Sequence, residues 1–95
     1  MEFQFSNTLW EWRGPAPFYF LSVPVEMAEQ IREAARVVSY GWGMIPVVAE
    51  IRGIEFKTSM FAKNGTYVLP IKSLVRVPLN LQVSDLVDVT MRLGA

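Results

Sequence analysis

Two groups of aromatic residues have the composition of a binding groove. The first lies in "TLWEWRGPAPFYF" and contains Trp10 and Trp12, with Arg13 directly after them. The second is "SYGWG", in which Tyr40 and Trp42 alternate with glycine. Tryptophan and tyrosine combine a large ring with a polar edge, and glycine lets a ligand approach the backbone closely. Core packing is the commoner role of such rings in a small barrel, and a groove at one barrel end is the alternative.

Two basic residues are spaced to share one side of a short predicted helix. Lys72 and Arg76 are four positions apart, which places them on neighbouring turns. Lys72 falls at the helix N-terminus, where the helix dipole disfavours a cation. Arginine can hold a phosphate or carboxylate with two parallel N–H groups. The pair therefore predicts an anion site, joined by Arg13 if its proline-rich loop folds over that end. A solvated charged face is the commoner alternative.

The composition excludes several classes of enzyme. The chain has no histidine and no cysteine, so ordinary zinc sites, cysteine nucleophiles and histidine-based triads are ruled out. The carboxylates do not have the spacing of a metal-binding loop. We therefore expect no catalytic residue, no metal and no cofactor. An enzyme that uses Lys72, Tyr40 or Glu11 is the least favoured alternative.

Charge and hydropathy narrow the partners. Nine basic and nine acidic residues cancel, whereas nucleic-acid-binding proteins usually carry a basic excess. This balance argues against nucleic acid as a partner. No run reaches the ~18 apolar residues of a membrane-spanning helix, and no signal peptide is visible, so we expect a cytoplasmic protein that does not contact membranes. The sequence leaves open whether it is a monomer or a homodimer.

The apolar pattern predicts six strands and their turns. Alternating and aromatic-rich segments indicate strands over 2–12, 18–23, 45–51, 54–62, 66–71 and 86–93. The Asn64-Gly65 pair predicts a type I′ hairpin, because both central residues of that turn have positive φ. Phe3 and Phe5 differ in parity from the two tryptophans that follow, which predicts a bulge near residues 6–7.

Two helices are predicted between the strands. Pro24 suits the first turn of a helix over 24–38, in which apolar residues recur at helical spacing. A shorter helix is predicted over 72–78, limited by Pro78. Two acid–base pairs at three-residue spacing support the longer helix, Glu29–Arg32 and Glu33–Arg36.

A short internal repeat suggests how these elements combine. The segments "YFLSVPVEMAEQIR" and "YVLPIKSLVR" both contain a strand, a proline and an amphipathic helix. We therefore predict one mainly β domain over residues 1–95. Its expected architecture is a small six-stranded split or closed β-barrel with pseudo-twofold internal symmetry and a helix capping each end.

Three segments carry a family resemblance: "SYGWGMIPVVAEI", "TSMFAKNGTYVLPIKSLVR" and "LVDVTMRL". They resemble the bacterial and archaeal family called domain of unknown function 1905, and "FSNTLWEWRGPAPFYFLSVP" extends the resemblance to nearly the whole chain. The resemblance implies a split β-barrel capped by helices, similar in shape to the swapped-hairpin barrels of dimeric antitoxins and transition-state regulators. It implies no activity. The family's usual Gly-Asp before the last strand is Ser84-Asp85 here, where we expect the Asp85 side chain to hold the turn.

The leading functional prediction is a non-catalytic binding module. It would present the aromatic-lined end of the barrel to a small anionic ligand or to a protein partner. The candidate ligand-binding residues are Trp10, Trp12, Arg13, Tyr40, Trp42, Lys72 and Arg76. By fold analogy alone, a nucleic-acid-binding regulator or an antitoxin-like protein is the first alternative. The second alternative is an enzyme that works without histidine or cysteine.

Overall fold

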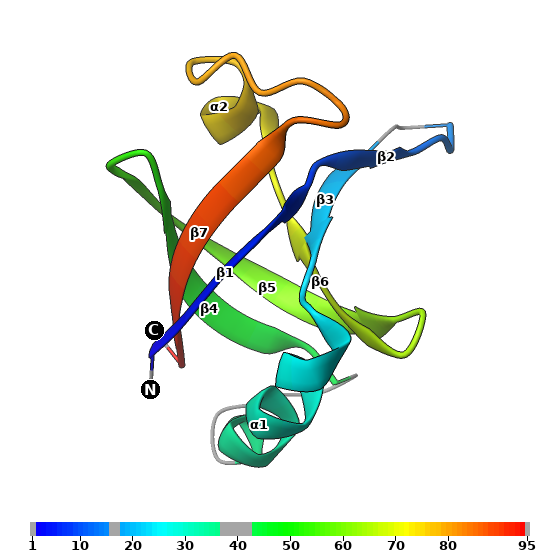
Figure 1. The fold of residues 1–95 in the computed structure, drawn as a ribbon, viewed down its shortest axis with the longest axis vertical. Coiled ribbons are helices and arrows are strands. Elements are labelled where there is room, and N and C mark those ends of the chain that lie inside the picture. Colours follow the sequence, from blue (N-terminus) through cyan, green and yellow to red (C-terminus); the bar gives the residue numbers. More distant parts are fainter. Residues whose placement is uncertain (1, 16–17, 37–42, 95) are drawn as a thin grey trace.

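The predicted strands form one curled antiparallel sheet. A computed structural model gives the structure and describes residues 2–15, 18–36 and 43–94. The strands are β1 (Glu2–Thr8), β2 (Trp10–Trp12), β3 (Phe18–Ser22), β4 (Ile45–Ile51), β5 (Ile54–Lys63), β6 (Thr66–Pro70) and β7 (Leu86–Leu93). Their order in the sheet is β1-β7-β4-β5-β6-β3-β2. The sheet bends into a half-barrel, with the helices α1 (Val25–Ala35) and α2 (Ser73–Arg76) at opposite ends (Figure 1).

The N-terminal strand is interrupted at Leu9, which corrects the predicted strand count. β1 pairs with β7 along its whole length, so the bulge expected near residues 6–7 is absent. The Leu9 N–H donates to the Asp85 carbonyl at 2.9 Å, and the Leu9 carbonyl accepts from the Ser84 N–H at 2.8 Å. These bonds tie Leu9 to the turn before β7 and end the first ladder. The predicted strand over 2–12 is therefore two strands. The prediction of a split or closed six-stranded barrel is corrected in its strand count, which is seven, and in its closed alternative, because the sheet is a half-barrel (Figure 1).

The strand pairing follows the same scheme in both halves of the chain. β1 pairs with β7 and the adjoining β2 pairs with β3. In the same way, β5 pairs with β4 over residues 54–60 and with β6 over residues 61–63. The partner changes at Leu9 in the first half and directly after Met60 in the second. Both side chains are buried in the core, with 1% and 0% of their surface exposed.

The pairing of β3 with β6 is symmetric about Leu21 and Leu69, which lie directly opposite each other. Matching hydrogen bonds flank this pair: the Val23 N–H donates to the Tyr67 carbonyl at 2.9 Å, and the Ile71 N–H donates to the Tyr19 carbonyl at 2.8 Å. Each strand then leads into a helix, β3 into α1 and β6 into α2. The repeated order of strand and helix in the sequence therefore corresponds to two equivalent places in the fold.

Both helices are shorter than predicted. α1 begins after Pro24, which is its N-cap, and ends at Ala35, where the prediction extended over 24–38. Its apolar face is buried against the sheet. The two expected ion pairs form on the solvent-exposed face, Glu29–Arg32 at 3.3 Å and Glu33–Arg36 at 3.7 Å. α2 covers only four of the residues predicted over 72–78. Past its end, the chain leaves the helical conformation at Asn80, whose φ is 52°.

Two turns follow the predicted chemistry. Asn64 and Gly65 both have positive φ, 55° and 80°, as a type I′ hairpin requires. In the turn before β7, an Asp85 carboxylate oxygen accepts the Gln82 N–H at 2.8 Å, so this side chain holds the turn as expected. Ser84 adopts a φ of 78° in that turn without being glycine.

The core lies inside the curl of the sheet and under α1. Its fully buried side chains come from both halves, and they include Leu21, Ile31, Ile51, Met60, Leu69 and Met91. None of the described helices is long and apolar enough to cross a membrane.

Candidate functional site

Five aromatic rings lie together on the sheet face that points away from the core. We call this surface the aromatic face, and it consists of Trp10, Trp12, Phe18, Phe20 and Phe61. The pleat of a strand places alternate residues on one side, so each of β2 and β3 contributes two rings. The register sets these rings directly opposite one another, Trp10 with Phe20 and Trp12 with Phe18.

The rings form a contiguous stack. The Trp10 and Phe20 centroids are 5.1 Å apart, and those of Trp12 and Phe18 are 6.1 Å apart. Phe18 and Phe20 are 6.3 Å apart along β3. Phe61 meets Phe20 edge to face at 5.7 Å. These separations are within the range at which aromatic pairs attract each other.

The stack is covered at its inner end and open at its outer end. Phe20 is only 5% exposed, beneath Trp10 and Phe61, whereas Phe18 is 51% and Trp12 is 42% exposed. The Trp10 indole N–H donates to the Ser22 hydroxyl at 2.9 Å, so its polar edge is already occupied. Trp10, Phe20 and Phe61 therefore support the stack, and Trp12 and Phe18 present their ring surfaces to solvent.

Gly14 makes room for the Trp12 ring. A Cβ atom at position 14 would lie 2.0 Å from Cζ3 of Trp12, closer than atoms can approach without a shift. The indole therefore rests against the backbone of the loop that follows β2. This contact fixes the side on which Trp12 lies, although the residue is at the edge of the sheet.

Three open grooves meet at Phe18. The widest, about 630 Å³, runs from the aromatic face along β5 and is bordered by Phe20, Phe61, Lys57 and Lys72. A smaller groove of about 270 Å³ lies between the rings and Lys63. The third, about 430 Å³, lies beside Tyr19 and includes Lys72 and Arg76. The described residues that line these three grooves include no carboxylate.

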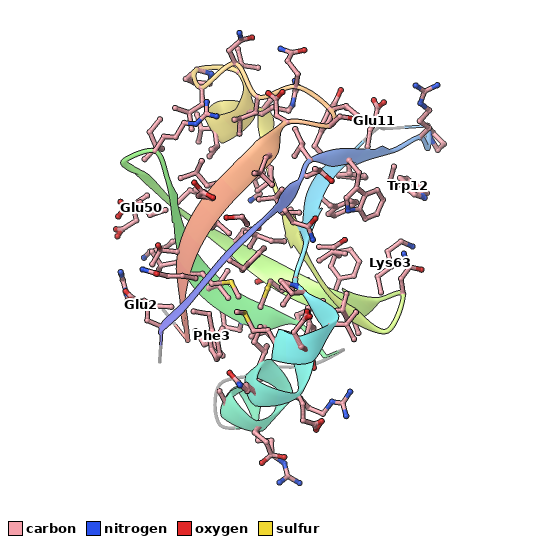
Figure 2. All side chains as sticks on the ribbon, in the orientation of Figure 1. Glu2, Phe3, Glu11, Trp12, Glu50 and Lys63 are labelled. Carbon is pink, nitrogen blue, oxygen red and sulfur yellow. The ribbon has the colours of Figure 1, made fainter. Side chains whose placement is uncertain are left out.

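The three lysines of the chain, Lys57, Lys63 and Lys72, all border these grooves. Within the part of the chain that the structure describes, none of them forms an ion pair. Four arginines, by contrast, each contact a carboxylate: Arg13, Arg32, Arg36 and Arg92. Figure 2 shows Lys63 and Trp12 on one side of the molecule and Glu2 and Glu50 on the opposite side. Three cations that form no ion pair with the described residues therefore border the aromatic face.

Arg76 is held by an aromatic ring. Its guanidinium carbon lies 4.0 Å from the centre of the Tyr19 ring, a cation–π contact. Its Nε is buried and has no hydrogen-bond partner among the described residues. The cation–π contact holds the guanidinium beside Lys72 in the third groove.

The structure brings together some of the predicted site residues and separates others. Trp10 and Trp12 share the aromatic face, and Lys72 and Arg76 line one groove, as their spacing predicts. Arg13 is not among the described residues that line this groove, and it pairs with Glu11 at 3.4 Å. The remaining two predicted residues, Tyr40 and Trp42, lie outside the described residues.

Sequence reasoning missed Phe61, Lys57, Lys63 and the role of Gly14. One signal could have found Phe61. Alternation along β5 places Phe61 on the side opposite to its neighbour Met60, and Met60 is fully buried in the core. Nothing in the sequence showed that this outer side is where the rings of β2 and β3 gather.

The side chains at this surface can stack on a flat group and bind an anion. Flat rings bind other flat rings by stacking, and lysine and arginine side chains bind anions. Among the described residues, no group of three or more Asp, Glu, His or Cys side chains is placed to hold a metal ion. The arrangement suits a ligand that has both a flat apolar part and negative charge.

Comparison with protein families gives one result. Residues 5–91 match the model of a family described as "Domain of unknown function (DUF1905)". The match covers all of the aromatic face, together with Lys57, Lys63, Lys72 and Arg76. No curated protein matches the chain.

Proposed function

The chain belongs to the DUF1905 family, and we propose that it is a non-catalytic binding module whose ligand is a small anion with a flat apolar part. The ligand would lie on the aromatic face, against Trp12 and Phe18. One observation carries this proposal. An exposed stack of rings is bordered by every lysine of the chain, and the described residues that line the grooves around it include no carboxylate.

The exposure of the rings supports a role beyond packing. Isolated exposed apolar side chains are common, but contiguous exposed patches mark interaction sites. The contiguous rings here are supported from below by buried Phe20 and from the side by Gly14, so they are held in place without a ligand. A preformed surface loses little conformational entropy on binding.

A pair of dyes tests the proposal. Anilinonaphthalene sulfonate is an anion with a flat naphthalene ring system, and N-phenylnaphthylamine is its uncharged counterpart. We expect the protein to bind the anionic dye more tightly at low salt and to lose that preference as salt is added. Trp12→Ala and Phe18→Ala should each weaken binding of both dyes roughly 2- to 12-fold through lost stacking. Lys72→Gln should weaken binding of the anionic dye alone.

Leu86→Ala is the matched control for these substitutions, because Leu86 is 66% exposed and lies on β7, outside the aromatic face. Thermal melting of each variant shows that it is folded. Equal binding of the anionic dye by the wild type and by Phe18→Ala would place the ligand elsewhere. Absence of binding to the wild type would remove the proposed function.

Several broader expectations go with this proposal. We propose a cytoplasmic protein that acts as a monomer or a homodimer, which light scattering distinguishes. We also propose that its two halves are related by pseudo-twofold symmetry, supported by their matching strand pairing. A protein partner at the aromatic face is the second candidate, and a pull-down competed by the anionic dye would reveal it.

A further inference from the structure

We infer that the ligand of the aromatic face is single-stranded nucleic acid. This inference rests on the binding function proposed above for the aromatic face and extends its ligand from one small anion to a chain of such units. Bases would stack on the exposed rings of Trp12 and Phe18, and phosphates would contact the lysines around them. Three observations lead to this class: the spread of the cations, the geometry of the open rings and the separation of charge on the molecule.

The cations are distributed along the surface. Lys63 lies in the groove beside Trp12. Lys57 and Lys72 border the wide groove, and Lys72 and Arg76 border the third groove. A small anion with one charged group would engage one of these grooves. A chain with a phosphate at every unit can engage all three, because they meet at the same ring.

The open rings suit consecutive bases. Trp12 and Phe18 are neighbours across two paired strands, with centroids 6.1 Å apart and ring planes tilted by 32°. Proteins that bind single strands commonly stack successive bases on such side chains, and every base has a ring surface to offer. The same contacts are closed to a duplex, in which the bases are stacked on one another. The surface therefore favours single strands over double strands.

From the net charge of zero we expected that nucleic acid is not a partner, but the charged side chains are not evenly distributed over the surface. Apart from Glu11, the acids lie on β1, on α1, on the β4–β5 hairpin and along β7 and its preceding turn: Glu2, Glu26, Glu29, Glu33, Glu50, Glu55, Asp85 and Asp88. Glu11 is the acid nearest in sequence to the rings, and its position between Trp10 and Trp12 turns it to the other side of β2. It is also paired with Arg13. A neutral chain can thus present a locally basic surface.

Fluorescence anisotropy with labelled oligonucleotides tests the inference. The probes are twelve-residue oligothymidylate and oligouridylate, with a duplex of the same length, thymidine monophosphate and inorganic polyphosphate as competitors. We expect both single strands to bind more tightly than the monophosphate and the duplex. For three lysine–phosphate contacts, the logarithm of the affinity should fall with the logarithm of the salt concentration with a slope of roughly −2.

Two sets of variants separate stacking from charge. Phe18→Ala and Trp12→Ala should each weaken oligonucleotide binding roughly 5- to 150-fold, the range for loss of one stacked base. Lys57→Gln, Lys63→Gln and Lys72→Gln should each reduce the salt slope by about 0.7. Arg32→Gln, an exposed arginine on α1, and Leu86→Ala should leave both quantities unchanged.

The outcomes distinguish this inference from the function on which it rests. Oligonucleotides that bind no more tightly than thymidine monophosphate, in a protein that still binds the anionic dye at the aromatic face, would overturn the inference and leave the proposed function in place. Binding of the duplex as tight as that of the single strands would also overturn it. So would full displacement of the oligonucleotide by polyphosphate together with unchanged oligonucleotide affinity in Phe18→Ala. Failure of both dye and oligonucleotide to bind would overturn both.

Discussion

Replacing Ser84 by glycine should stabilise the fold, and the structure sets the size of the effect. Ser84 has a φ of 78°, in the left-handed region that residues with a Cβ atom avoid. Its N–H donates to the Leu9 carbonyl, a bond that glycine can also make. Its hydroxyl forms no hydrogen bond with the described residues. The substitution therefore relieves backbone strain without removing a side-chain hydrogen bond.

The expected gain is a difference between two terms. A residue other than glycine in the left-handed conformation costs about 1–2 kcal/mol. Glycine loses about 0.5–1 kcal/mol more conformational entropy on folding than alanine does. The net stabilisation is therefore about 0.5–1 kcal/mol. For a domain of this size, 1 kcal/mol corresponds to a shift of roughly 4–8 °C, so the melting temperature should rise by about 2–8 °C.

Thermal unfolding followed by circular dichroism measures this shift. Ser84→Ala is the matched control, because it removes the hydroxyl and keeps the Cβ atom, and it should not raise the melting temperature. Asn80→Gly offers a comparison, since Asn80 also has a positive φ but asparagine tolerates that conformation better, so its gain should be smaller. A lower melting temperature for Ser84→Gly, or an equal rise for Ser84→Ala, would refute the left-handed backbone at this turn.

Four other substitutions have defined outcomes. Asp85→Ala removes the bond to the Gln82 N–H and should cost about 1 kcal/mol of unfolding free energy, measured by urea titration. Met60→Ala, at the fully buried point where β5 changes partner, should cost about 2–5 kcal/mol in the same assay. Thr66→Val removes the hydroxyl that donates to the Val23 carbonyl at 2.8 Å, so it should lower the free energy of unfolding by about 1–3 kcal/mol. Unchanged stability of this variant would contradict that hydrogen bond. Gly14→Ala should displace the Trp12 indole, which would shift tryptophan emission and weaken dye binding, and unaltered emission would contradict the contact between this ring and the loop.

The sequence predicted the parts of the fold that depend on local chemistry. The Asn64-Gly65 hairpin, the ion pairs on α1 and the holding role of Asp85 are all set by residues within a few positions, and the structure has them. The break at Leu9 was not predictable in this way. It depends on backbone bonds to residues 84–85, which lie far along the chain, and the change of parity alone could not place it.

The candidate site was only partly predictable for a related reason. Alternation in β2 showed that Trp10 and Trp12 share a side, but not whether that side faces the core. Curvature of the sheet decides this, because it encloses one side and exposes the other. Lys57 and Lys63 lie beside the rings because β6, the hairpin partner of β5, pairs with β3, which is distant in sequence. No residue close to either lysine in the sequence indicates this placement.

The matching strand pairing of the two halves has a consequence for how such a surface can arise. By their place in the pairing, Trp12 corresponds to Lys63, and Phe18 to Thr66. In an assembly of two identical ββαβ chains, every substitution would appear at both positions together. A single chain that holds both halves can place a ring at one position and a cation at the other. A single chain with this pairing can therefore carry a surface with two different ends, and a nucleic-acid strand bound as inferred above would lie on it in one direction.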